Sequence, residues 1–232
     1  PLLIVVFTLR KYIDKKSIKS IGFKFKYKAK DIGLGFLFAL IIIGGGAGLI
    51  QYLGFIDISF NQFNFAQVLV GFCLFFIVSI SEEILFRGYI LNNLLDSMNK
   101  YVALIISALI FSSFHGLNSN LTKIGFANLF LAGVLLGSAY VFIKNLWFSI
   151  SLHLFWNFIQ GSILGFSVSG LKIESLFDVK NTGDKIFSGG EFGFEGSLLC
   201  TLFTAISILI ILMYFIFENK RKLTKSRIEI LV

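Results

Sequence analysis

Two adjacent glutamates, Glu82 and Glu83, lie inside a stretch of sequence that otherwise reads as membrane-spanning. The residues before them, 65–80, are almost all apolar, and Arg87 follows four positions after Glu83. Ionisable side chains are unfavourable in the hydrocarbon of a bilayer and persist mainly where they face a polar cavity and serve a function. These residues are therefore the first candidates for chemistry.

Helical geometry predicts different roles for the two acids. A helix advances about 100° per residue, so residues four apart share a face. Glu83 and Arg87 are predicted to form an ion pair on one face. Glu82 points about 100° away from Glu83 and is predicted to face a cavity as the less neutralised acid. A carboxylate in that position could take a proton from water and pass it on.

Two further pairs at i,i+4 spacing contain the only histidines of the chain. Phe111 is predicted to pack beside the ring of His115, and His153 is predicted to project together with Asn157. Imidazole and carboxylate groups are ligands that zinc accepts, so Glu82, His115 and His153 are candidate metal ligands. Alternatively, His153 and Asn157 could donate hydrogen bonds to a developing oxyanion. The residues leave both interpretations open.

A bland interpretation exists for each of these features taken alone. A single buried histidine is usually a packing residue, and one Glu–Arg pair in a helical bundle is usually structural. The double acid, both histidines and an asparagine fall on three predicted spans, and this grouping favours a functional site.

The composition indicates a membrane protein. The 232 residues are 56% hydrophobic, include 29 Phe and one Pro, and have a mean hydropathy of +0.85. Soluble domains rarely exceed about half apolar residues. The apolar runs are continuous rather than alternating, which excludes a transmembrane barrel. The net charge of +8 comes from basic residues beside the predicted spans, so we expect contact with a lipid bilayer and no nucleic-acid partner.

The apolar runs predict an all-α polytopic transmembrane helical bundle. About six full spans are expected, each near the ~20 residues that a bilayer requires, after a truncated N-terminal helix. The predicted spans are 32–54, 66–93, 101–118, 124–143, 146–167 and 196–217. The expected organisation is a truncated first helix with a basic cytoplasmic segment (1–31), a transmembrane catalytic bundle (32–217) with an external loop (168–195), and a basic cytoplasmic tail (218–232).

Charge orients this bundle by the positive-inside rule. The lysine-rich segment 10–30 is predicted to be cytoplasmic, which places 55–65 and 168–195 outside. Counting 1.5 Å per residue along the helices puts Glu82 and His153 in the cytoplasmic third of the bilayer. The same count leaves His115 about 20 Å from the cytoplasmic side, which does not match the other two.

The three motifs, in this order on successive spans, resemble a known family. The motifs are Glu82-Glu83-x-x-x-Arg87, Phe111-x-x-x-His115 and His153-x-x-x-Asn157. They are similar to those of the CPBP (Abi) intramembrane proteases, which include CAAX prenyl protease 2 and bacteriocin-processing enzymes. The stretch 146–158 looks like the third motif of the family. The stretch 189–197 is similar to bacterial members, although Phe194 stands where proline is expected.

The resemblance implies a helical bundle with a site open toward the membrane and an intramembrane endopeptidase activity on membrane-embedded or lipidated peptides or proteins. It implies that Glu82 activates a water, supported by Glu83 and Arg87. It further implies that His115 holds water or a metal, and that His153 with Asn157 stabilises the oxyanion. Members have been described both as metalloproteases and as glutamate-dependent enzymes, so a divalent metal such as zinc stays an open candidate cofactor.

Two other functions are compatible with the same residues. A catalytically silent bacteriocin-immunity or binding protein would keep the fold without the reaction. A proton-coupled transporter would use buried Glu and His as a relay, but no inverted repeats and no helices broken by Gly or Pro are apparent. The Lys-, Ile-, Phe- and Asn-rich composition suggests a multi-pass protein of a bacterial plasma membrane, where leader peptides or peptide pheromones are expected substrates.

Overall fold

The computed structural model describes residues 2–24 and 28–231, with side chains described as far as Phe217. Lys26 of the predicted basic segment and the side chains of the tail 218–232 lie outside the described residues. The structure is 74% helical.

The elements follow one another as helices with two short strands. The α-helices are α1 (Leu2–Thr8), α2 (Lys28–Ala39), α3 (Gly46–Tyr52), α4 (Phe65–Glu83), α5 (Asn92–Ser97), α6 (Lys100–Phe114), α7 (Lys123–Ile143), α8 (Trp147–Asn157), α9 (Lys185–Ser188) and α10 (Leu198–Leu231). The π- and 3-10 helices are η1 (Leu9–Ile13), η2 (Ile18–Ile21), η3 (Leu40–Gly45), η4 (Ile84–Leu91), η5 (Phe158–Ile163), η6 (Gly190–Phe192) and η7 (Phe194–Gly196). The strands are β1 (Ile56–Phe60) and β2 (Phe177–Asn181).

Four helical stretches among the described residues are long and apolar enough to cross a membrane. They are Lys28–Tyr52, Phe65–Ser97, Lys123–Ile143 and Leu198–Phe217. The predicted count of about six full spans is therefore not confirmed. Two predicted spans are shorter in the structure, because α6 has 15 residues and α8 has 11 before it continues into η5.

The end of α6 shows why the predicted span 101–118 is too long. The backbone N–H groups of His115 and Gly116 bond to the carbonyls of Ser112 and Ser113, at 3.2 and 3.0 Å. These i→i−3 bonds tighten the last turn and stop the helix. His115 therefore sits at the helix end, inside the thickness of the bundle.

Side chains at the helix starts fix where three of the long elements begin. Asn64 accepts from the backbone N–H groups of Ala66 and Gln67 at the start of α4. Asn99 caps α6 and Thr122 caps α7 in the same way. Such caps satisfy backbone donors that a helix leaves unpaired at its first turn.

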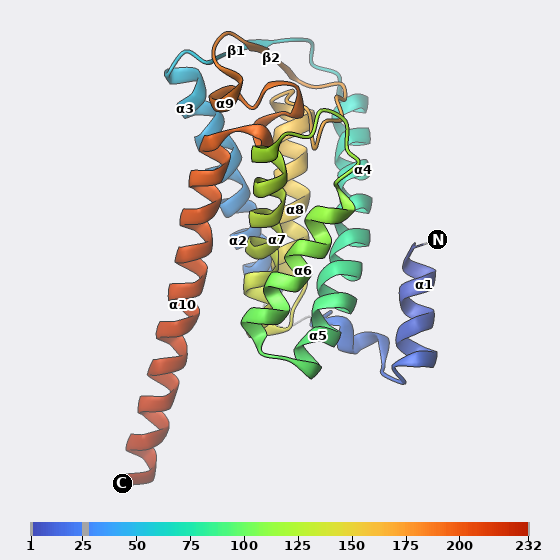
Figure 1. Ribbon diagram of the computed structural model, residues 1–232, viewed down its shortest axis with the longest axis vertical. Helices are drawn as coiled ribbons and strands as arrows, with labels where there is room; N and C mark the ends of the chain where they lie inside the picture. The colour runs from blue at the N-terminus through green and yellow to red at the C-terminus, as the bar shows by residue number, and fades with distance from the viewer. Residues whose placement is uncertain (1, 25–27, 232) are drawn as a thin grey trace.

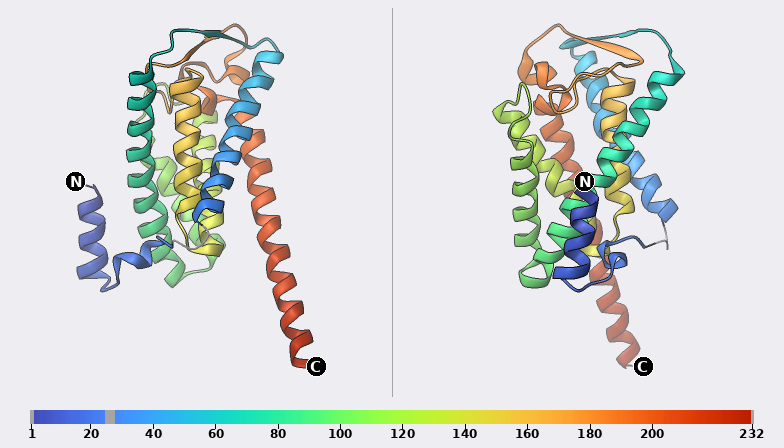
Figure 2. Two further views of the ribbon diagram at one scale, coloured as in Figure 1. Left: turned by 180° about the vertical axis from the view of Figure 1, so that it is seen from behind. Right: turned by 90° about the vertical axis from the view of Figure 1, so that its right-hand side faces the viewer.

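The helices form a bundle in which α8 packs against α2, α4 and α7, and α10 lies along α7 (Figure 1). Strands β1 and β2 lie across one end of the bundle, seen from two further sides in Figure 2. They pair antiparallel, with Ile58 opposite Val179. The sequence predicted both segments only as loops, so the prediction of a purely helical fold misses this small sheet. We call this end of the bundle the loop face.

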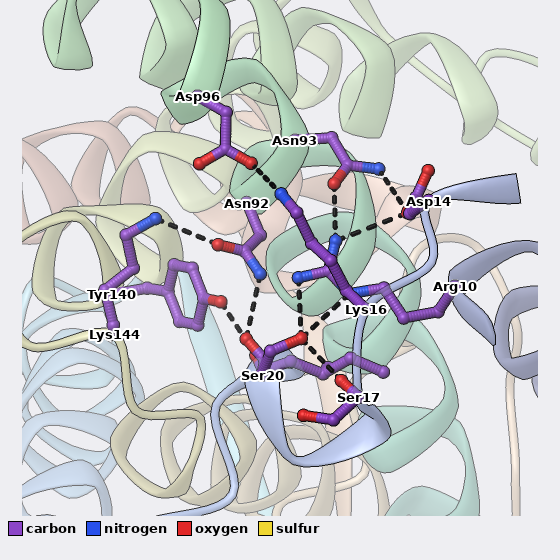
Figure 3. Close-up of polar contacts among 11 residues, drawn as sticks. Arg10, Asp14, Lys16, Ser17, Ser20, Asn92, Asn93, Asp96, Tyr140 and Lys144 are labelled. Atoms are coloured by element: carbon purple, nitrogen blue, oxygen red, sulfur yellow. Dashed lines mark hydrogen bonds and ion pairs between the residues drawn. The ribbon is translucent and has the colours of Figure 1, made fainter.

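The opposite end, where the N-terminal segment meets α5 and the end of α7, is closed by a polar network (Figure 3). The buried Arg10 side chain donates to the Ser20 hydroxyl at 2.8 Å, and Asn92 donates to the Ser20 carbonyl at 3.0 Å. The Tyr140 hydroxyl donates to the carbonyl of Ile21 at 2.7 Å. These bonds tie residues 10–21 to the helices above them. We call this end the basic end.

Candidate active site

Three helices bring Glu82, His115 and His153 together. Glu82 lies near the end of α4, His115 follows α6, and His153 is in α8. The Oε2 atom of Glu82 is 3.7 Å from Nε2 of His115 and 4.0 Å from Nε2 of His153. All three side chains and Asn157 line one cavity of about 500 Å³. The mismatch in depth that helix counting gives for His115 is absent from the structure.

Glu83 and Arg87 form the predicted ion pair, which is confirmed. Arg87 Nη1 donates to Glu83 Oε1 at 2.7 Å, and the side chains are 1% and 0% exposed. The same oxygen lies 2.9 Å from Nδ1 of His153. Arg87 Nη2 donates to the Gly133 carbonyl at 3.1 Å, and the guanidinium lies 4.6 Å from the centre of the Phe111 ring. The buried Glu83 carboxylate thus orients the His153 ring and is itself held by the Arg87 guanidinium.

Hydrogen bonds at Nδ1 set the tautomer of both histidines. His115 Nδ1 lies 2.8 Å from the Phe111 carbonyl, which only accepts, so the ring must donate. His153 Nδ1 likewise faces the Glu83 carboxylate. In a neutral ring the proton is then on Nδ1, and Nε2 carries a lone pair. The predicted packing of Phe111 on His115 is confirmed, with ring centres 4.6 Å apart.

Lone pairs without a donor therefore meet at the centre of the site. Both Nε2 atoms face Glu82 Oε2, which is buried and has no hydrogen-bond partner among the described residues. Buried acceptors are normally satisfied. A hydrogen-bond donor or a positive charge between Glu82 Oε2 and the two Nε2 atoms would satisfy these acceptors, and a water molecule, a shared proton or a metal ion could supply it.

The chemistry of the donor set can be compared with a zinc site. Two histidines and a glutamate, each histidine anchored through Nδ1, are a ligand set that catalytic zinc uses. Ligand atoms around tetrahedral zinc are about 3.4 Å apart, whereas here Glu82 Oε2 is 3.7 and 4.0 Å from the two nitrogens. Consistent with this wider spacing, no group of three or more His, Cys, Asp or Glu side chains close enough to hold a metal was found in the described part of the chain.

The wall between α4 and α6 is apolar and reaches the outside of the bundle. Leu74 and Val78 of α4 and Phe111 and Phe114 of α6 line the cavity. Leu74 is 41% exposed and Phe114 66% exposed. On a bundle surrounded by lipid, this partly exposed apolar wall offers an apolar peptide or a lipid chain a route to the site.

Sequence reasoning missed the part of the cavity that loops provide. Residues 117–119 and 168–171 line it, together with Trp156 and Glu195. Glu195 accepts hydrogen bonds from Trp156 Nε1 at 3.1 Å and from the backbone N–H of Ser169 at 2.7 Å. Its buried carboxylate thus fastens the turn 168–171 to α8. The similarity of the stretch 189–197 to bacterial family members was the one sequence signal near Glu195.

Comparison with known proteins identifies the family of the central region. Residues 64–159 match the model of the Rce1-like family, described as type II CAAX prenyl endopeptidase Rce1-like. This range contains all six predicted site residues. Neither the curated proteins nor the solved structures include a significant match to the chain. The match covers the central region only, which is thus similar to type II CAAX prenyl endopeptidases. Together with the four apolar helices it supports a multi-pass membrane protein.

Proposed function

We propose that this chain belongs to the CAAX protease family and hydrolyses peptide bonds of membrane-associated substrates with a water that Glu82 activates. The observation that carries the proposal is the convergence of Glu82 Oε2 with the two Nε2 atoms, 3.7 and 4.0 Å away, in one cavity.

The attacking water fits between Glu82 and His115. It donates one hydrogen to Glu82 Oε2 and the other to the lone pair on His115 Nε2, which satisfies both acceptors. As the water oxygen bonds to the carbonyl carbon of the substrate, its proton passes to Glu82. The tetrahedral intermediate then collapses, the C–N bond breaks, and Glu82 gives the proton to the leaving amine.

His153 and Asn157 supply the hydrogen bonds for the negative oxygen. Asn157 lies one turn after His153 on α8 and lines the same cavity, so its amide N–H can point at the developing oxyanion. The Glu83 carboxylate at His153 Nδ1 stabilises a proton on Nε2, which turns that atom into a second donor. Glu83 orients His153 and favours positive charge on its ring, and Arg87 holds the Glu83 carboxylate in place.

Replacing Asn157 by Ala tests the oxyanion role. Loss of one preorganised donor is expected to lower kcat about 10²-fold with little change in KM, because the bond forms mainly in the transition state. The assay is cleavage of a lipidated or membrane-inserted peptide by the protein reconstituted in liposomes. Asn157→Asp keeps the shape but replaces the donor with a carboxylate, and we expect at least as large a loss. An Asn157→Ala enzyme with wild-type kcat would contradict this role.

A divalent metal such as zinc would be held by Glu82, His115 and His153, the three groups that converge. When bound it would polarise the attacking water and lower the pKa of that water. The residues have the chemistry for this ligand set, but their spacing is wider than zinc requires, and we favour water held directly by the side chains.

Chelators distinguish a mechanism in which the side chains hold the water directly from one that uses a metal ion. We expect the reconstituted enzyme to keep most of its peptide cleavage after incubation with 1,10-phenanthroline or EDTA followed by removal of the chelator. Cleavage that disappears and returns on addition of zinc would assign the three side chains to a metal instead. A matched incubation with the non-chelating 1,7-phenanthroline controls for effects on the membrane.

The substrate class follows from the position of the site. The exposed apolar side chains of Leu74 and Phe114, which line the cavity, suit a peptide that carries a lipid chain or is itself inserted in the bilayer. The sequence composition favours a bacterial plasma membrane, where leader peptides and peptide pheromones are the candidate substrates.

A further inference from the structure

The cavity reaches the loop face and is closed toward the basic end. At the loop face its wall includes Leu117, which is 100% exposed, and Leu171, which is 59% exposed. These residues belong to the loop that follows α6 and to the turn 168–171. Helix α6 has only 15 residues, and the loop that follows it runs beside α4 toward the loop face (Figure 1). Residues 117–119 of this loop line the cavity.

Below Glu82, packed side chains fill the bundle. Phe86, Glu83 and Arg87 are at most 1% exposed, and Ser107 donates to the Phe86 carbonyl at 3.2 Å. Among the described residues, none in 2–24 or 92–101 lines the cavity. The polar network at the basic end closes the space below this floor (Figure 3).

Charge distinguishes the two ends of the bundle. Basic residues predominate at the basic end, where the described ones are Arg10, Lys11, Lys15, Lys16, Lys19, Lys24, Lys28, Lys30, Lys100 and Lys144, against Asp14, Asp31 and Asp96. The loop face carries a mixture with an excess of acids, namely Asp57, Glu174, Asp178, Asp184, Glu191 and Glu195 with Lys123, Lys172, Lys180 and Lys185. The positive-inside rule assigns the basic end to the cytoplasm and the loop face to the other side of the membrane.

We propose that the catalytic cavity opens to the non-cytoplasmic side of the membrane, so the enzyme cleaves peptides that are exposed at, or inserted from, the outer surface. That peptides are cleaved rests on the proposed function. The side of the membrane on which the cavity opens rests only on the shape of the cavity and the distribution of charge. This inference concerns the side from which the site is reached and leaves the depth of Glu82 along α4, as residue counting gives it, unchanged. A peptide whose cleaved bond stays on the cytoplasmic side would have to pass the packed floor at Phe86 and Arg87.

Cysteine accessibility in intact cells tests the side without requiring catalysis. In a background with Cys73 and Cys200 replaced by alanine, single cysteines are introduced as Ala132→Cys, Leu117→Cys and Lys19→Cys. Ala132 lines the interior of the cavity, Leu117 is at its mouth, and Lys19 is exposed at the basic end. Maleimides react with thiolates in contact with water, so a membrane-impermeant maleimide reports which side the water comes from.

We expect the cysteines at 132 and 117 to be labelled in intact cells and the cysteine at 19 only after permeabilisation. Ala103→Cys is the matched control for Ala132→Cys, because Ala103 is 0% exposed and does not line the cavity; it should stay unlabelled throughout. Labelling of position 132 only after permeabilisation, or not at all, would overturn the inference.

The two proposals fail differently. If labelling follows the expected pattern but no lipidated or inserted peptide is cleaved, the sidedness stands and the proposed function is wrong. If peptides are cleaved and the labelling pattern is reversed, the proposed function stands and the sidedness is wrong.

Discussion

Replacing Glu82 by Gln is expected to lower kcat for peptide cleavage about 10³-fold, within the range that a positioned general base contributes. The amide has the shape of the carboxylate but cannot take a proton from water. It can donate to the lone pair on His115 Nε2, which preserves the packing of the cavity. We therefore expect KM to change little. The measurement is steady-state cleavage of a lipidated or membrane-inserted peptide in proteoliposomes, normalised to folded protein.

The matched control is Glu191→Gln, because Glu191 is exposed on the loop face and does not line the cavity. This variant should cleave like the wild type. Normal turnover by Glu82→Gln would rule out the glutamate mechanism. A cellular assay separates enzyme from scaffold: if the chain protects cells from a bacteriocin and Glu82→Gln protects them equally well, it acts as an immunity or binding protein.

The local part of the site could be predicted from the sequence. The Glu83–Arg87 ion pair and the Phe111–His115 contact depend only on i,i+4 spacing, and the structure contains both. The i,i+4 spacing does not predict that one oxygen of Glu83 contacts both Arg87 and His153, which lie on different helices. That contact depends on how α4 and α8 pack.

The loops and the span lengths were not predictable in the same way. Strand β1 pairs with β2 across about half of the sequence, and no local pattern marks two segments that pair at such a distance. Helix α6 ends at Phe114, where the apolar run gives way to His115, Gly116 and Asn118 and the chain turns. Hydropathy alone continues the predicted span to residue 118. Since the cavity mouth depends on that early end, its direction could be recognised only in three dimensions.

Replacing Arg87 by Met is expected to destabilise the fold by about 3–5 kcal/mol, because it leaves the Glu83 carboxylate buried without its cation. In a chain of this size, that loss lowers Tm by about 6–20 °C. Thermal unfolding in detergent measures it. Lys16→Met is the matched control, because it breaks the ion pair between Lys16 and Asp96. These two side chains are 43% and 49% exposed, and exposed pairs contribute at most about 1 kcal/mol to stability.

The double variant Arg87→Met with Glu83→Gln separates folding from catalysis. With both charges gone, no unpaired ion is buried, and we expect most of the lost Tm to return. The amide oxygen of Gln at position 83 can still accept from His153 Nδ1, so the ring keeps its orientation. It cannot stabilise positive charge on that ring as the carboxylate does, and cleavage should stay well below the wild type. A stable double variant with full cleavage would show that His153 works without the Glu83 charge, which would remove it as a charged oxyanion donor.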